Sequence, residues 1–348
     1  MQDYRDNLAA KVIGIHNKRW SYSDRWISFC QKNNINYVVL DIYDSDFLSK
    51  IRYHGITHFL FHLGALEYRA DIYLKYLAYL LEKEGVKVFP GFKEYWHYDD
   101  KVKQKYLFEQ VQIPHAKMHV LYKKDDALEW ISDELNYPFV FKLRNGFRSN
   151  NVRLVKRRKE ARRLVKKMFG KGIKAAPSLR NEVISKWEKR NSVIDKLKFI
   201  KGLPRMVSKY YSDARRYLSR ERGYFLAQKF IPGLDKDFRL KVVNNTCWGL
   251  IRYTRENDFR ASGSDIADYD QKKIPIELVE LSFQIAEKLE MQSVAFDFVY
   301  DGKEPLLLEV SYCYGIDEEQ LNGYWTRDLK FHKGYFRPEH LIIESLLG

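Results

Sequence analysis

The chain has 348 residues, 45% of them hydrophobic and 15% aromatic, so it can bury two or three cores and is not typical of a disordered protein. Its three cysteines, Cys30, Cys247 and Cys313, have no paired spacing, which argues against a disulfide framework or a zinc site. The sequence shows no signal peptide and no apolar run of membrane-spanning length, and we expect a cytoplasmic protein.

The positive charge is concentrated in one region. The formal net charge is +15, but residues 153–224 alone hold 24 Lys and Arg against six Asp and Glu, a local balance of +18 that leaves about −3 for the remainder. Such a region should face an anionic partner: nucleotide phosphates, an acidic glycan, an anionic membrane surface or nucleic acid.

The first third of the chain predicts a parallel α/β unit. Apolar strands are expected at 11–20, 37–43, 56–64 and 86–91, with helices at 23–33 and 73–84. Strands that alternate with helices at this spacing form a parallel sheet. The unit lacks the glycine fingerprint of a dinucleotide site, so we expect it to frame one side of a cleft.

A helix is predicted at 98–114, beginning after Asp99-Asp100 and ending before Pro114. It carries Lys101 in its first turn. With Lys103 and Lys105 it forms a lysine-rich pattern that is also typical of a solvated helix face.

A small α/β unit follows, with strands at 118–122 and 137–143 around a helix at 125–135. The second strand ends at Lys142 and leads into the polar loop 144–155. Backbone N–H groups of such a loop can cradle phosphates beside a lysine, although a plain β-hairpin turn needs no ligand.

Basic helices come next. Residues 156–169 predict one helix, and residues 185–224 predict a pair broken at Gly202-Leu203-Pro204. These helices could simply pack on their own domain, or they could present a surface to lipid headgroups or an anionic polymer.

The last third predicts strands that carry charged side chains. Residues 225–245 contain a strand, a Pro-Gly turn and a strand with Asp237 and Arg239 on one face. Residues 248–265 add further arginines before a glycine loop. An amphipathic helix is expected at 277–291, and a closing helix lies within 323–347.

A β-hairpin at 295–311 places two carboxylates opposite one another. Asp297 and Glu309 are equidistant from Lys303, which we take as the centre of the turn. Like charges directly opposite destabilise a sheet, and a magnesium ion between them would remove that penalty. The alternative is a solvated hairpin with two exposed acids.

The chain resembles the ATP-grasp superfamily in four stretches that occur in order: PFVFKLRNGFRSNNVRLV, FLAQKFIPGLDKDFRL, IRYTRENDFRASGS and SVAFDFVYDGKEPLLLEVSYCYG. Members include D-alanine–D-alanine ligase, glutathione synthetase and the ribosomal-protein glutamate ligases. The resemblance covers about residues 100–315. It implies an α/β ATP-grasp fold with an N-terminal parallel pre-ATP-grasp lobe (1–98), a first subdomain (99–171), a basic helical insertion (172–222) and a second subdomain with the metal site and C-terminal helix (223–348).

The resemblance also implies roles for individual residues. Those expected to bind ATP are Lys101, Lys142, Gly146, Ser149, Asn151, Gln228, Lys229, Ile231 and Asp235. Those on the magnesium-ligand positions are Asp297, Glu309 and Ser311. Arg239 or Arg255 would stabilise an oxyanion, and Arg260, Ser262 and Gly263 would hold the acceptor carboxylate.

Three positions depart from the family pattern. The phosphate loop reads Gly-Phe-Arg-Ser rather than Gly-x-Gly-Ser, Ser311 replaces the usual Asn, and Gln228 replaces Glu. An amide can still accept a hydrogen bond from the adenine amino group.

The resemblance implies an ADP-forming ligase that uses ATP and Mg²⁺ to join a carboxylate to an amine through an acyl phosphate. The pattern is most similar to members linked to bacterial surface-polysaccharide synthesis, and the basic insertion suggests an acidic sugar substrate or a position at the inner face of the membrane. Two alternatives are a phosphotransferase acting on an alcohol and a basic nucleic-acid-binding protein with a vestigial nucleotide site. We expect no specific nucleic acid, because the basic stretch has no recognised nucleic-acid module.

Overall fold

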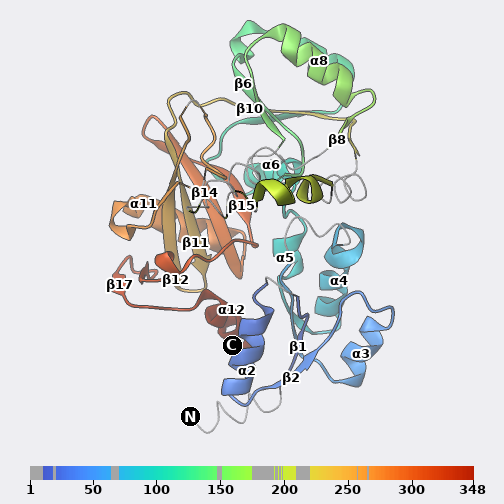
Figure 1. The fold of residues 1–348 in the computed structure, drawn as a ribbon, viewed down its shortest axis with the longest axis vertical. Helices are drawn as coiled ribbons and strands as arrows, with labels where there is room; N and C mark the ends of the chain where they lie inside the picture. Colours follow the sequence, from blue (N-terminus) through green and yellow to red (C-terminus); the bar gives the residue numbers. More distant parts are fainter. Residues whose placement is uncertain are drawn as a thin grey trace.

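The computed structural model describes residues 11–18, 21–63, 70–146, 151–174, 192, 195, 197, 199–208, 220–256, 258–264 and 266–348. These residues form an N-terminal lobe, a small antiparallel sheet and a large antiparallel sheet, which is the predicted α/β class (Figure 1). No helix among them is both long and apolar enough to cross a bilayer.

The N-terminal lobe is the predicted parallel α/β unit. Its four strands pair in parallel in the order β2-β1-β3-β4. The strands are β1 (Val12–Ile15), β2 (Asn36–Val39), β3 (His58–Leu60) and β4 (Lys87–Phe89), and the helices are α2 (Ser23–Lys32), α3 (Phe47–Tyr53), α4 (Ala70–Lys83) and α5 (Phe92–Tyr95). The sequence reading missed α3, because its seven residues bury only Phe47 and Ile51 and so carry little periodicity.

The small sheet has the order β5-β10-β6-β7, and every pair in it is antiparallel. Its strands are β5 (Met118–Leu121), β6 (Phe139–Lys142), β7 (Val152–Val155) and β10 (Phe225–Lys229), with helices α6 (Lys101–Gln110), α7 (Lys124–Trp130) and α8 (Arg158–Met168). Helix α6 begins after Asp99-Asp100 as predicted, and Asp100 caps it by accepting a hydrogen bond from the Lys103 N–H. Because β10 follows the basic region, this sheet extends beyond residue 171, where the first subdomain was expected to end.

The large sheet runs β15-β14-β11-β12-β16-β17, with β13 beside β12. Its strands are β11 (Lys236–Val243), β12 (Thr246–Tyr253), β13 (Ala267–Asp268), β14 (Ser293–Asp301), β15 (Glu304–Ser311), β16 (Gly323–Trp325) and β17 (Phe331–Lys333). Helix α11 (Ile276–Lys288) is amphipathic as predicted and buries its apolar residues against one face of this sheet. The opposite face therefore remains for the N-terminal lobe and for the polar side chains discussed below.

The β14–β15 hairpin pairs Asp297 with Glu309, as predicted, but through a β-bulge. The loop Gly302-Lys303 pairs Asp301 with Glu304, and this register would bring Asp297 opposite Leu308. The register shifts by one residue between Asp297 and Phe298, which leaves Leu308 without a partner and brings Glu309 into place. The bulge also interrupts the alternation of faces along β15, since Leu307 and Val310 share one core while Leu306 and Leu308 pack on another cluster.

Most of the basic insertion, including most of the predicted helix pair at 185–224, lies outside the described residues. Residues 199–208 are helical, and this helical stretch includes Gly202-Leu203-Pro204, where the sequence predicted a break. Two short strands, β8 (Ile173–Lys174) and β9 (Arg220–Glu221), pair at the base of this region.

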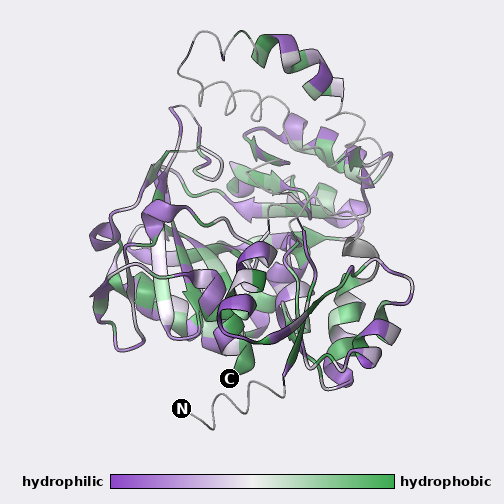
Figure 2. Cartoon of the chain, turned by 60° about the horizontal axis from the view of Figure 1, so that its bottom comes forward, coloured by the Kyte–Doolittle hydropathy of each residue, from purple (hydrophilic) through white to green (hydrophobic). Residues whose placement is uncertain are grey.

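One hydrophobic core joins the N-terminal lobe to the large sheet. It contains residues of α2 and β3 together with Trp248 and Tyr312 from the large-sheet region and the apolar face of α12 (Pro338–Leu347). The Trp26 Nε1–H donates to the Glu339 carbonyl oxygen at 2.9 Å, which ties α2 to α12. Figure 2 shows hydrophobic and hydrophilic residues side by side along the helices, as expected of helices that bury one face.

Candidate functional site

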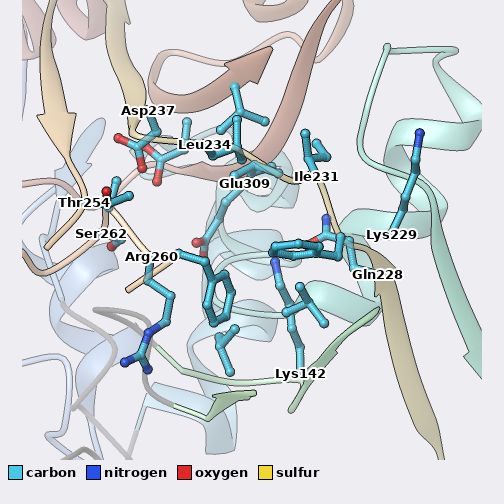
Figure 3. Close-up of a pocket in the computed structure, with 18 of the residues that line it drawn as sticks. Lys142, Gln228, Lys229, Ile231, Leu234, Asp237, Thr254, Arg260, Ser262 and Glu309 are labelled. Carbon is cyan, nitrogen blue, oxygen red and sulfur yellow. The ribbon is translucent and has the colours of Figure 1, made fainter. Parts of the chain in front are cut away.

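A cleft lies between the small and the large sheets, and its empty space together with the adjoining solvent is about 850 Å³ (Figure 3). Both sheets and their connecting segments contribute to its wall. Its lining residues are Lys101, Val140, Lys142, Gly146, Val152, Gln228, Lys229, Phe230, Ile231, Leu234, Lys236, Asp237, Thr254, Phe259, Arg260, Ala261, Ser262, Asp297, Val299, Leu308 and Glu309. The predicted site residues that the structure brings together here are Lys101, Lys142, Gly146, Gln228, Lys229, Ile231, Arg260, Ser262, Asp297 and Glu309.

Two lysines lie on the small-sheet side of this cleft. The Lys101 Nζ donates to the Gly146 carbonyl at 2.8 Å and lies 3.5 Å from Glu309 Oε1. Burial alone would lower the pKa of Lys101, but the carboxylates of Glu309 and Asp99 raise it overall. For Lys142, burial and the charge of Lys101 outweigh the opposing effect of the Glu309 and Asp297 carboxylates, and its pKa falls to about 8. A site with this pair of cations is prepared for an anion such as a phosphate.

The first residues of the loop after β6 are held by hydrogen bonds to the segment at Asp99 and Lys101. The Gly146 N–H donates to Asp99 Oδ1 at 3.0 Å, and the Lys101 N–H donates to the Arg144 carbonyl at 3.0 Å. Gly146 has a φ of 148°, which favours glycine. Of the loop residues expected to bind ATP, Ser149 lies outside the described part of the chain, and Asn151 does not line the cleft.

The carboxylate of Asp297 is held by two arginines. Arg239 donates to it from Nε at 2.6 Å and from Nη2 at 2.7 Å, and Arg252 Nη2 lies 2.9 Å from Oδ2. Burial would raise the pKa of Asp297, but the two guanidiniums hold it well below its usual range. The penalty of placing Asp297 opposite Glu309 is thus compensated by Arg239 and Arg252 on one side and by Lys101 on the other.

We tested whether these acids fit a magnesium ion. Glu309 lines the cleft, its side chain is 30% exposed, and its nearest described cation is Lys101. Asp297 has about four lone-pair sites, of which the arginines take three. Mg²⁺ needs only one or two carboxylates beside phosphates and water, so Glu309 with the remaining lone pair of Asp297 fits it. No group of three or more His, Cys, Asp or Glu suited to a metal occurs among the described residues.

An apolar part of the cleft adjoins these charges. This apolar wall offers a surface for a flat ring. It is formed by Val140, Ile231, Leu234, Val299 and Leu308. The buried Gln228 donates to the Ala116 carbonyl at 3.5 Å beside it.

The backbone N–H of Lys229 already has a hydrogen-bond partner within the protein. It donates to the Lys117 carbonyl at 2.9 Å, so this N–H is not available for the expected contact with ATP. The side chain extends to Asp301 at 2.7 Å, and Figure 3 shows it directed away from the other labelled residues.

Six predicted site residues do not line the cleft: Asn151, Asp235, Arg239, Arg255, Gly263 and Ser311. The Asp235 carbonyl accepts the Thr254 N–H at 2.7 Å, and Arg255 Nη2 donates to the Gly263 carbonyl. The Ser311 hydroxyl donates to the Cys313 carbonyl at 2.8 Å. Arg260 lines the cleft while it binds Asp258 at 2.8 Å.

Sequence reasoning left several lining residues out of the site. Asp237 and Lys236 on β11 and Thr254 after β12 lie among them. Asp237 shares a strand face with Arg239, and that alternation was the signal that could have placed it at the site. Leu308 was not assigned to the site, because the assumed regular pairing of Asp297 with Glu309 places Leu308 on the opposite face of the hairpin.

Comparison with known proteins gives one family and a set of related folds. Residues 171–322 match the family described as the RimK-like ATP-grasp domain. The comparison with curated proteins finds no significant match.

Three solved structures illustrate the likeness in fold. One is a RimK domain ATP-grasp protein from Sphaerobacter thermophilus, with a TM-score of 0.53 and 16% identity over 97% of this chain and 100% of that one. Another is the D-alanine–D-alanine ligase of Bacillus anthracis, with a TM-score of 0.55 and 15% identity over 97% of both chains. A third is the biotin carboxylase domain of the Hydrogenobacter thermophilus 2-oxoglutarate carboxylase in complex with MgADP, with a TM-score of 0.55 and 13% identity over 96% of this chain and 69% of that one.

Proposed function

Because the chain has the ATP-grasp ligase fold and contains a RimK-like ATP-grasp domain, we propose that it is an ADP-forming ligase that joins a carboxylate to an amine. The observation that carries this proposal is the cleft between the sheets. It combines an apolar wall for a base, a buried and a half-buried lysine for phosphates and two acids that fit a magnesium ion.

In the first step, an oxygen of the substrate carboxylate attacks the γ-phosphorus of ATP, and the bond to the β–γ bridging oxygen breaks. ADP leaves, and an acyl phosphate forms. Lys101 and Lys142 neutralise charge on the phosphates, and the loop at Gly146 orients them. Glu309 and Asp297 would hold magnesium, which would supply further charge neutralisation at the phosphates.

In the second step, the amine nitrogen attacks the acyl carbon, inorganic phosphate leaves, and the nitrogen loses a proton. The intermediate carries an oxyanion that a guanidinium can stabilise. Arg239 uses Nε and Nη2 on Asp297, so its Nη1 is its remaining donor group for this role. Arg255 is the second candidate, while Arg260, Ser262 and Gly263 would hold the acceptor carboxylate.

We also propose an acidic polymer, such as a surface polysaccharide or its precursor, as the carboxylate substrate. Helix α8 supports this view. Its apolar residues are buried, while its arginines and lysines are exposed. Helix α8 directly follows β7, whose first residue, Val152, lines the cleft. A polymer, unlike a small molecule, could contact the exposed cations of α8 and still extend along the small sheet to the cleft.

The test is a screen for ADP release from ATP and Mg²⁺, with amino acids paired against uronic-acid and peptide carboxylates. We expect ADP only when both a carboxylate and an amine are present, together with an amide product detected by mass spectrometry. A stable phosphorylated alcohol as the product would instead identify a phosphotransferase and overturn the ligase proposal.

A further inference from the structure

Arg252 does not line the cleft, but it binds two carboxylates that do. It donates to Asp237 from Nε at 2.6 Å and from Nη2 at 2.7 Å, and its Nη2 lies 2.9 Å from Asp297 Oδ2. The Arg252 side chain is only 11% exposed, so these bonds are shielded from bulk water. Charge-assisted bonds of this kind hold a carboxylate in a defined direction.

The guanidinium of Arg252 spans three strands. Arg252 on β12 is the ladder partner of Asp237 on β11, whereas Asp297 is on β14, the next strand beyond β11. Arg252 therefore links the register of β12 to the carboxylate that stands opposite Glu309.

Arg252 contributes two separable effects. It neutralises Asp237, whose pKa is raised by burial even though Arg252 works against that shift. It also restrains the Oδ2 atom of Asp297, which Arg239 holds from its other side. A lysine at this position would keep the charge but could not bind two carboxylates through a planar fork.

We propose that Arg252 is a positioning residue of this site. It fixes the carboxylate of Asp297 relative to Glu309 and thereby sets the affinity for the divalent cation that accompanies the nucleotide. The inference rests on the proposed function, since it requires a magnesium nucleotide in this cleft. It extends that function by assigning a role to a side chain outside the cleft wall.

A double-mutant cycle separates positioning from simple neutralisation. The variants are Arg252→Met, Asp237→Asn and the two combined, because the double variant removes the unpaired buried charge that Arg252→Met leaves behind. The probe is a non-hydrolysable imido analogue of ATP, whose binding is followed by fluorescence with and without Mg²⁺, and thermal unfolding is measured alongside.

We expect Arg252→Met to raise the Mg²⁺ concentration needed for half-maximal nucleotide binding at least tenfold, with metal-free binding changed less than twofold. The double variant should recover the melting temperature but not the Mg²⁺ affinity. Arg252→Lys should fold and show the same Mg²⁺ defect. Arg52→Met is the matched control, because Arg52 binds Glu84 at an exposed site in the N-terminal lobe, and it should bind like wild type.

Recovery of Mg²⁺ affinity in the double variant would overturn the inference and reduce Arg252 to a neutralising partner of Asp237. Wild-type Mg²⁺ affinity in Arg252→Met would also overturn it while leaving the ligase proposal intact. If the wild-type protein binds no magnesium nucleotide, the proposed function fails, and this inference fails with it.

Discussion

Asp297 and Glu309 face one another across β14 and β15 because one extra residue, Leu308, is accommodated in β15. A regular hairpin with the same turn would have paired Asp297 with Leu308. The bulge therefore brings an apolar side chain and a carboxylate from consecutive residues into the same cleft. Bulges that re-aim side chains in this way occur next to active sites, and this one lies where the apolar wall meets the charged groups.

Replacing Glu309 by Gln should reduce Mg²⁺-dependent ADP release at least a hundredfold. The amide keeps the shape of the side chain but loses the charge that faces the cation and Lys101. Steady-state ADP release and circular dichroism are the measurements. Glu304→Gln, at an exposed position of the same strand, is the control and should retain wild-type turnover. Near-normal turnover in Glu309→Gln would contradict the metal assignment.

Nucleotide affinity should fall as the pH rises through about 8, the value to which burial lowers the pKa of Lys142. Above that pH the free protein loses the ammonium that faces the phosphates, and each further pH unit should cost up to about tenfold in affinity. Lys101 should not contribute to this change, because its pKa is raised.

The measurement for Lys142 is calorimetric binding of the imido analogue between pH 7.5 and 9.5. Lys142→Arg keeps its charge throughout this range, so its affinity should be independent of pH. Lys142→Met should bind weakly at every pH. The same decline in the Arg and Met variants would assign the pH dependence to another group.

Neutralising the exposed face of α8 should weaken binding to an acidic polysaccharide. The variant carries four substitutions: Arg162→Gln, Arg163→Gln, Lys166→Gln and Lys167→Gln. Retention on immobilised polygalacturonate should fall several-fold and lose its dependence on salt. The matched control neutralises four exposed lysines elsewhere: Lys32, Lys83, Lys87 and Lys333. Equal retention of the two variants would contradict a specific role for α8.

The same α8 variant should be as stable as wild type or more stable. Arg162 and Lys166, and likewise Arg163 and Lys167, are like charges four residues apart, and each such pair costs about 0.2–0.5 kcal/mol in a helix. Urea unfolding measures this difference. A large loss of stability would show that these side chains make stabilising contacts rather than serving an external partner.

Trp26→Ala should destabilise the whole protein by about 3–5 kcal/mol, since it empties a fully buried position in the core shared by α2 and α12. Trp26→Phe should cost less, because it retains most of the packing and loses only the bond to the Glu339 carbonyl. Urea unfolding monitored by circular dichroism gives both values. A separate early transition for the N-terminal lobe would contradict a shared core.

The sequence predicted the elements whose periodicity is strong. The parallel order of the first lobe, the start of α6 after Asp100, the end of β6 at Lys142 and the amphipathic α11 all follow from local patterns. The same patterns could not predict that β10 joins the small sheet, because that pairing connects residues on either side of the basic insertion.

The charges that surround Asp297 and Glu309 are set by how the strands pair in the folded protein. The opposition of Asp297 and Glu309 was predicted on the assumption of a regular hairpin, whereas the structure reaches it through a bulge. Sequence reasoning offered a metal ion as the compensating charge, but Arg252 reaches Asp297 across an intervening strand. Neither a bulge nor a contact across a strand has a local sequence period, so single-sequence patterns contain no signal for them.

The packing of α12 against α2 has a consequence for biosynthesis. Ile342, Ile343, Leu346 and Leu347 belong to the same core as Ile13 and Ile15, although more than 300 residues separate them along the chain. The N-terminal lobe is synthesised before α12, and its core stays incomplete until α12 has left the ribosome. Contacts of such high sequence separation slow folding and prolong the exposure of apolar surface. The apolar surface of the N-terminal lobe that α12 covers therefore stays exposed while both later sheets are synthesised.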